Sequence, residues 1–348
     1  MIIDADAHVV ENERTWEYLD PSARKYRPQL VNLPQALPRP QAWVIPSSVG
    51  GSQSFVWPIP LRSEIKDPES REVSDVPARI KQMDEAGIDV QVLHSTMFER
   101  QVTDRPHVDV PICRAWNRWM ADVYKEGNGR LRWTLVPPLT SMTDAVDEIR
   151  FGKANGAVGV LMRPVEGERV LPDPYFYPLY EEAHRLDLPI IVHSGNGCAW
   201  YTDLYDTPYE SANAFGQFQM PVVTFVHQLT VSQLPKLFPT LRWGVLEAGA
   251  QWIPWIVFEA QRRLTRGQRW PEDGFAAFHT YVTCDPHDDL PEILRYSGED
   301  TLLIGSNYGK PESEQGMGAV NTFRKGSGLD APIVQKVLEG NPRALYGI

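Results

Sequence analysis

The sequence has 348 residues, of which 42% are hydrophobic and 23% charged, and its formal net charge is -11. A chain of this length can bury one large core or form two domains. The negative charge and the lack of a basic cluster argue against a nucleic-acid partner. No apolar run approaches the roughly 18 residues of a membrane span, and Asp4 and Asp6 interrupt the apolar N-terminal stretch. We therefore expect a soluble, cytoplasmic protein without a signal peptide or a membrane partner.

The first apolar run, residues 2–10, carries Asp6 and His8. Residues i and i+2 of a strand point to the same face, so both side chains should project together from the end of this strand. A carboxylate and an imidazole placed in this way suit a divalent metal, with a solvated strand end as the structural alternative. A metal needs more than two ligands, so the remaining ones must come from elsewhere in the chain.

Seven further apolar runs follow, with amphipathic segments between several of them. The runs are residues 90–93, 131–139, 157–162, 189–193, 241–247, 280–283 and 301–304; the helical segments are residues 76–86, 110–126, 142–154, 174–186, 251–265 and 290–296. Apolar strands that alternate with helices imply a parallel sheet, and eight such units imply an α/β fold of the (β/α)8 barrel type in a single domain, residues 1–348. A doubly wound open sheet is the alternative, but no Gly-rich dinucleotide-binding turn follows any strand.

Two segments depart from this pattern. Residues 34–75 are rich in Pro, Ser and Gly with scattered aromatics such as Trp43 and Trp57, and they are predicted as a long insertion after the first strand. Residues 197–220 carry many aromatics and are predicted as a lid. Either segment could shape a substrate pocket or an interface with another subunit.

The three cysteines, Cys113, Cys198 and Cys284, are odd in number and widely spaced. This spacing argues against a disulfide framework and against a cysteine zinc site. No histidine lies at nucleophile-defining spacing from Cys198 or Cys284, and no Gly-x-Ser-x-Gly turn occurs, so cysteine and serine hydrolase chemistry lack support. Any metal must be held by histidine and carboxylate.

In a (β/α)8 barrel, polar residues at the carboxyl ends of the strands converge on one face and form the active site. In chain order, the strand ends deliver Asp6 and His8, His94, Arg163, His193, Glu247, Cys284 with Asp285, and Asn307. Together they predict a polar mouth above an apolar barrel.

These motifs resemble the amidohydrolase-2 branch of the amidohydrolase superfamily. The resemblance rests on Asp-x-His in the first strand, His-Ser-Gly at residues 193–195, residues 241–254 (LRWGVLEAGAQWIP), residues 305–309 (GSNYG) and the closing Asn-Pro-x-x-Leu-Tyr-Gly at residues 341–347. It covers nearly the whole chain with the motifs in the family's order. It implies a metal-dependent decarboxylase or hydrolase of carboxylated, often aromatic, substrates.

The resemblance also implies a ligand set. Asp6 and His8 match the ligand pair of the first strand, and His193 matches the ligand of the fifth. One divalent ion is expected, with zinc favoured and manganese or iron as alternatives, because the fourth strand ends without the lysine that binuclear relatives use. Asn307 stands where the family has an aspartate, and Lys310 stands where relatives often have histidine. An amide cannot exchange a proton, so proton transfer from position 307 should be lost.

Three further residues are predicted to contribute. His227 is a candidate metal ligand that would swing in from a helix, the alternative being a histidine hydrogen-bonded beneath a loop. Glu247 is a candidate ligand or general base, or else a carboxylate that interacts with a following helix N-terminus. Arg163 suits a bidentate contact with a substrate carboxylate, and a structural ion pair is the alternative.

The expected function is therefore metal-dependent decarboxylation or hydrolysis of a small carboxylated substrate, with Glu247, Asn307 and Arg163 in the catalytic site. Two alternatives remain open. An iron or manganese oxygenase could use the same fold, and a non-catalytic subunit could pair with an active homologue. We expect a homo-oligomer or a hetero-oligomer with a related barrel subunit.

Overall fold

The computed structural model describes residues 1–32, 41–45, 55–59, 65–205, 215–263, 269–310 and 316–348. Eight strands form one sheet in the order β1-β5-β6-β7-β10-β11-β12-β13, and every pairing within this sheet is parallel. The strands are β1 (Ile3–Val9), β5 (Val90–Ser95), β6 (Leu131–Leu135), β7 (Ala157–Met162), β10 (Ile190–His193), β11 (Trp243–Leu246), β12 (Thr280–Cys284) and β13 (Leu302–Ile304). All eight lie within or overlap the predicted runs, so the barrel prediction is confirmed.

The strands are buried on both faces, as the continuous apolar runs predict. Every residue of β1 and of β7 is buried. This pattern is typical of a parallel sheet that is filled on the inside and covered by helices on the outside. The run predicted at 131–139 ends earlier, at Leu135, because Pro137 and Pro138 lack the amide hydrogen that a strand donates.

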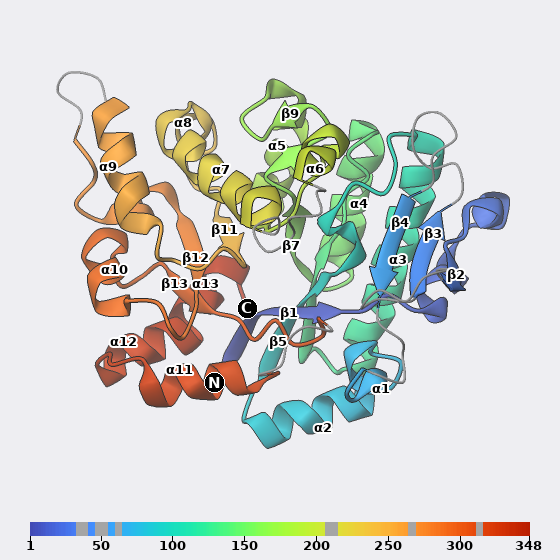
Figure 1. Ribbon diagram of the computed structural model, residues 1–348, viewed down its shortest axis with the longest axis horizontal. Helices are drawn as coiled ribbons and strands as arrows, with labels where there is room; N and C mark the ends of the chain where they lie inside the picture. The colour runs from blue at the N-terminus through green and yellow to red at the C-terminus, as the bar shows by residue number, and fades with distance from the viewer. Residues whose placement is uncertain (33–40, 46–54, 60–64, 206–214, 264–268, 311–315) are drawn as a thin grey trace.

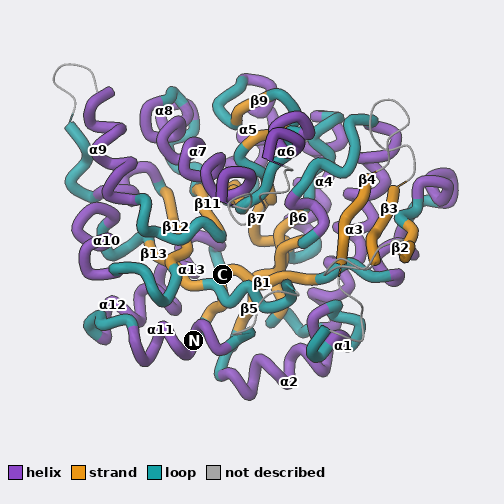
Figure 2. The backbone as a smooth tube through the Cα atoms, in the orientation of Figure 1, coloured by secondary structure: helices purple, strands orange, loops and turns teal. Residues whose placement is uncertain are grey.

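Helices surround the strands (Figures 1 and 2). The longer ones are α2 (Val76–Ala86), α3 (Pro106–Glu126), α4 (Met142–Ala154), α5 (Tyr177–Arg185), α7 (Met220–Val231), α9 (Ile253–Arg263), α10 (Leu290–Ser297) and α11 (Gly318–Gly326). Shorter ones are α1 (Pro68–Arg71), α6 (Ala199–Tyr205), α8 (Leu234–Leu237), α12 (Ala331–Gln335) and α13 (Asn341–Tyr346). No helix in the described part of the chain is both long enough and apolar enough to cross a membrane.

Further short helices lie in the connections. The 3-10 helices are η1 (Glu13–Tyr18), η2 (Pro21–Tyr26), η4 (Met97–Glu99), η5 (Pro174–Phe176) and η8 (Gly274–Phe278), and the π-helices are η7 (Phe215–Gln219) and η9 (Lys336–Gly340). The predicted helices at 76–86, 142–154 and 290–296 are confirmed. The helix predicted from residue 110 begins earlier, at Pro106, a residue that suits a first helical turn because its missing amide hydrogen would have no partner there.

The insertion after the first strand contains a second, antiparallel sheet, β2-β3-β4, at the right of Figure 1. Its strands are β2 (Gln29–Asn32), β3 (Gln41–Ile45) and β4 (Phe55–Ile59). Trp43 and Trp57 are paired across β3 and β4 and are buried, so the aromatics of this segment pack against the core. A two-residue hairpin, β8 (Val165–Glu166) with β9 (Arg169–Val170), follows β7.

The predicted lid at 197–220 is described only in part, because residues 206–214 lie outside the described residues. Its described ends are α6 and η7, and Trp200, Leu204 and Phe215 there are more than half exposed. Residues 264 and 265 of the helix predicted at 251–265 also lie outside the described residues. Helix α9 covers residues 253–263, so the helix begins two residues later than predicted.

Candidate metal centre and the cavity above it

The end of β1 supplies two of the predicted ligands, and β10 supplies the third. Asp6, His8 and His193 are all at most 2% exposed. Asp6 Oδ1 lies 3.4 Å from His8 Nε2 and 3.4 Å from His193 Nε2. Two strands that are far apart in the sequence therefore bring histidine nitrogens close to Asp6 Oδ1 at the mouth of the barrel.

These three atoms fit one divalent ion. Asp6 Oδ1, His8 Nε2 and His193 Nε2 are buried and have no hydrogen-bond partner in the described part of the chain. Buried polar atoms without partners are costly, so an ion that binds them would recover that cost. Ligands about 2.1 Å from a tetrahedral metal are about 3.4 Å from one another, and the two measured separations match this spacing.

The hydrogen bond of His193 orients its ring for this purpose. His193 Nδ1 lies 2.8 Å from the carbonyl oxygen of Ser194, an acceptor that requires Nδ1 to carry a hydrogen. The neutral ring then presents its lone pair on Nε2, toward Asp6. Burial lowers the pKa of His193, but the Asp6 and Glu247 carboxylates together outweigh burial and raise this pKa to about 9. A metal ion here would take the place of that proton.

His94, at the end of β5, lies beneath the centre. Its Nδ1 is 2.9 Å from Thr134 Oγ1, and its Nε2 is 3.9 Å from Asp6 Oδ1. Burial lowers the pKa of His94 to about 3, so the ring is neutral. His94 is therefore a neutral histidine that is hydrogen-bonded to Thr134 beside the three donor atoms.

The segment after β13 closes the barrel against β1. The amide of Asn307 donates to the Asp6 carbonyl at 2.9 Å, and the amide of His8 donates to the Tyr308 carbonyl at 2.7 Å. A Cβ atom at Gly309 would overlap the His8 carbonyl, and the φ of Gly309 is +117°. Glycine is therefore required there, and this close approach fixes the direction of the His8 side chain.

Asn307 lies close to Asp6, after the last strand of the barrel. Its φ is +51°, a conformation that asparagine tolerates better than most residues. Its Oδ1 is buried and without a hydrogen-bond partner in the described residues, and with Asp6 it lines a cavity of about 610 Å³. A neutral amide oxygen can complete a metal's coordination, but it cannot accept a proton as an aspartate would.

A buried polar network holds β1 in place. Asp4 accepts hydrogen bonds from the Ser306 amide at 2.8 Å and from Gln91 Nε2 at 2.7 Å. Arg79, which is fully buried, donates to Gln91 Oε1 at 2.7 Å and to the His8 carbonyl at 3.2 Å. The strand end that carries Asp6 and His8 is thus tied to α2, β5 and the segment after β13.

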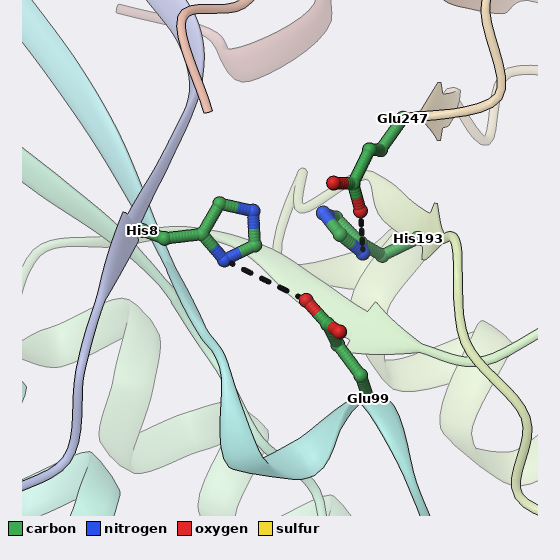
Figure 3. A group of neighbouring side chains, drawn as sticks. All are labelled: His8, Glu99, His193 and Glu247. Carbon is green, nitrogen blue, oxygen red and sulfur yellow. Dashed lines mark ion pairs between the residues drawn. The ribbon is translucent and has the colours of Figure 1, made fainter. Parts of the chain in front are cut away.

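A second group of donors adjoins the first. His8, Glu99, His193 and Glu247 each offer one ligand atom, and these atoms lie within 4.8 Å of one another. Figure 3 shows the four side chains pointing toward a common centre from different elements. Glu99 comes from η4 and Glu247 from the residue after β11, where its φ is +57°.

Lys310 pairs with both carboxylates of this group. Its Nζ lies 2.5 Å from Glu247 Oε1 and 2.7 Å from Glu99 Oε1, and its side chain is 14% exposed. Burial would lower the pKa of Lys310, but the two carboxylates raise it above its ordinary range. Burial would raise the pKa of Glu247, but Lys310, His193 and His8 hold it below its ordinary range. Lys310 and Glu247 are therefore both charged.

Arg163 holds the loop that carries Glu99. Its guanidinium donates to Glu166 Oε2 and to the carbonyl oxygens of Phe98 and Arg100, the residues on either side of Glu99. These contacts are those of the structural ion pair that the sequence left as the alternative. Contact of Arg163 with a substrate carboxylate stays a prediction, and Arg163 is not among the residues that line the 610 Å³ cavity.

The structure does not bring His227 to the centre. His227 lies on α7, and the charges that act on its pKa come from Arg263 and Glu259 of α9. Burial together with Arg263 lowers this pKa. The ring therefore faces the neighbouring helix, whereas the three donor atoms lie at the strand ends.

Two residues of the site were not predicted in their observed roles. Glu99 follows β5 by four residues, so its place after a strand end was the signal that could have identified it. Lys310 follows Asn307 by three residues, and this short spacing was the signal that could have placed it in the same mouth. The pairing with Glu99 and Glu247 depends on contacts between three different connections.

The fold is a parallel eight-stranded barrel, and its His and carboxylate side chains at the carboxyl ends of the strands could hold a metal ion. The family model described as Amidohydrolase (Amidohydro_2) matches residues 3–348. The chain therefore belongs to the amidohydrolase family.

Comparison with known proteins gives similar proteins of several activities. A 2-keto-4-carboxy-3-hexenedioate hydratase from Sphingobium sp. (strain NBRC 103272 / SYK-6) is 26% identical over 203 residues, which are 55% of this chain and 56% of that protein. The match thus spans about half the length of this curated relative.

Solved structures share the fold over most of the chain. An amidohydrolase from Mycobacterium avium subsp. paratuberculosis K-10 has a TM-score of 0.77 at 21% identity and covers 99% of both chains. The 2,6-dihydroxybenzoate decarboxylase of Rhizobium has a TM-score of 0.64 at 20% identity, over 77% of this chain and 87% of that one. A dihydroxybenzoic acid decarboxylase from Polaromonas sp. JS666, with bound manganese and the inhibitor 2-nitroresorcinol, has a TM-score of 0.65 at 16% identity, over 99% and 96%.

Proposed function

We propose that this protein is a metal-dependent lyase that acts on a small carboxylated substrate, with decarboxylation as the reaction that the site supports best. The observation that carries the proposal is a set of three buried atoms, Asp6 Oδ1, His8 Nε2 and His193 Nε2. They have no hydrogen-bond partner among the described residues, and Asp6 Oδ1 lies at ligand spacing from each nitrogen. The 610 Å³ cavity beside them has room for a small organic acid.

A divalent ion bound there would attract a substrate carboxylate and stabilise negative charge that develops next to it. The protein's own residues favour a reaction that does not begin with proton removal by residue 307. Asn307 has no carboxylate to act as a base, so hydrolysis by the route that the family's aspartate implies lacks its proton acceptor. Decarboxylation needs a proton delivered to carbon, and the Lys310 ammonium, which carries protons, lines the cavity where that proton is required.

Hydration is the second candidate. It is supported by the 26% identity to a hydratase whose substrate name describes an unsaturated keto acid. Hydration and decarboxylation share the need for a carboxylate-binding cation and for charge stabilisation on the neighbouring carbon framework. Decarboxylation releases carbon dioxide and hydration adds water to a double bond, so product assays distinguish the two reactions.

The metal assignment is tested by elemental analysis of purified protein after dialysis against zinc, manganese or iron. We expect one ion per chain in the wild type and a large loss of bound metal in His193→Gln and in Asp6→Asn. His227→Gln is the matched control, because it removes a histidine that faces α9, and it should retain the ion. If His227→Gln loses the metal and His193→Gln keeps it, the proposed centre is wrong.

Activity is tested with the metal-loaded protein on a panel of small acids. Dihydroxybenzoates are assayed for release of carbon dioxide, and unsaturated keto dicarboxylates for loss of ultraviolet absorbance on addition of water. Turnover in either assay should disappear in the Asp6→Asn variant. Oxygen consumption without either product would contradict the lyase proposal and favour the oxygenase alternative.

A further inference from the structure

The carboxylates of Glu99 and Glu247 form a second cation position beside the proposed metal centre. Their ligand atoms lie with those of His8 and His193 in one group that spans at most 4.8 Å. His8 Nδ1, fully buried and without a hydrogen-bond partner in the described residues, faces this position and is 3.8 Å from Glu99 Oε1. A group of this composition suits a divalent ion.

We propose that the ammonium of Lys310 permanently fills this second position, so that the protein binds one metal ion where its donor set could hold two. Lys310 Nζ contacts Glu247 Oε1 at 2.5 Å and Glu99 Oε1 at 2.7 Å. An ammonium between two carboxylates satisfies their charges in the way that a metal would, but it offers no open coordination position to a substrate. This inference rests on the proposed metal centre and adds its stoichiometry.

The two histidines explain why one metal lies on the Asp6 side. A neutral imidazole has one lone pair, so each ring can serve only one of the two positions at a time. His193 Nδ1 is occupied by the Ser194 carbonyl at 2.8 Å, which leaves Nε2 for the Asp6 side. His8 Nε2 lies at ligand spacing from Asp6 Oδ1, at 3.4 Å. The second position therefore depends on its two carboxylates, and these are the groups that Lys310 holds.

Neighbouring side chains hold Glu99 and Glu247 in position around Lys310. Arg163 fixes the carbonyl oxygens on both sides of Glu99, at 2.9 Å and 3.0 Å. Ser194 Oγ donates to Glu247 Oε2 at 2.8 Å. The backbone that carries Glu99 and the carboxylate of Glu247 are thus held by contacts other than the ammonium, as a preorganised cation site requires.

The inference predicts that removal of the ammonium opens the position to a second metal ion. Lys310→Met keeps the length of the side chain and removes its charge. Lys81→Met is the matched control, because the Lys81 side chain is 78% exposed. This substitution removes the same formal charge, but at the surface. Both variants and the wild type are equilibrated with manganese, freed of excess metal by gel filtration, and analysed for manganese per chain and by electron paramagnetic resonance.

We expect one manganese per chain in the wild type and in Lys81→Met, and two in Lys310→Met, with the spectrum of an exchange-coupled pair. The second ion should be lost again in the double variant Lys310→Met/Glu99→Gln. One manganese in a folded Lys310→Met protein would overturn the inference. Two in the wild type would overturn it as well, and this measurement does not depend on whether any variant folds.

The outcome is separable from the test of the proposed function. If Asp6→Asn keeps its metal, the proposed centre fails whatever Lys310→Met does. If Asp6→Asn loses its metal and Lys310→Met still binds one ion, only the inference about Lys310 fails.

Discussion

Glu11 makes the stability of this protein depend on pH in a direction that can be calculated. Its buried carboxylate lies at the end of the first strand segment and accepts hydrogen bonds from the Ser95 hydroxyl and from the amides of Thr96 at 3.2 Å and Met97 at 3.1 Å. Burial nevertheless raises the pKa of Glu11 from 4.5 to about 7. Glu11 thereby ties β1 to the connection that carries Glu99.

The direction of the pH dependence follows from the linkage between proton binding and folding. The folded state binds the proton of Glu11 more tightly than the unfolded state, so this contribution to stability is fully present below pH 4.5 and is lost as the pH rises through about 7. The difference between the two pKa values corresponds to a total loss of about 3 kcal/mol, because each pKa unit is worth about 1.4 kcal/mol. Glu11 is 3% exposed, so no large reduction for solvent screening applies.

The assay is urea unfolding, followed by tryptophan fluorescence, for the wild type and Glu11→Gln between about pH 4.5 and pH 8. Glutamine cannot ionise, so the free energy of unfolding of the wild type should fall relative to the variant by about 2 to 3 kcal/mol over this range. A constant offset between the two proteins reflects only the changed hydrogen bonds. Parallel pH curves would refute the reasoning.

Three further outcomes are expected. Gly309→Ala should lower the free energy of unfolding by at least about 2 kcal/mol in urea titrations, because its Cβ would overlap the His8 carbonyl at a positive φ. Arg163→Lys should lower it by about 1 to 3 kcal/mol while one bound metal remains in elemental analysis, because lysine cannot reproduce the fork that meets Glu166 and two carbonyls. Asn307→Asp should bind zinc at least about 10-fold more tightly in chelator competition, because a charged oxygen replaces a neutral one at the site. An unchanged zinc affinity would place residue 307 outside the coordination shell.

The barrel could be predicted from the sequence because its signal is local. Each strand is a short apolar run buried on both faces, and such runs alternate with amphipathic helices along the chain. The convergence of Asp6, His8 and His193 was predictable for a related reason. Two of them share a strand face, and the third ends another strand of the same parallel barrel.

The rest of the site depends on contacts that no local pattern encodes. The prediction for His227 treated a helix residue as free to reach the centre, whereas packing of α7 against α9 directs its ring toward Glu259 and Arg263. The position of Glu99 is set by the Arg163 guanidinium and by the Glu11 carboxylate, from connections distant in the sequence. The sequence around Glu99 therefore gave no basis for predicting its contacts with these residues.

The side chains at positions 307 and 310 both affect the charge balance of the site. Asp6, Glu99 and Glu247 contribute three negative charges, and Lys310 contributes one positive charge, so the formal sum is -3 + 1 = -2. One divalent ion neutralises this sum. With an aspartate at position 307 and an uncharged side chain at position 310, the same site would carry -4 and would require two divalent ions for neutrality in a buried environment, where unbalanced charge is costly. The asparagine and the lysine therefore act in the same direction. Asparagine avoids one negative charge and lysine adds one positive charge, so each lowers by one the positive charge that bound metal must supply.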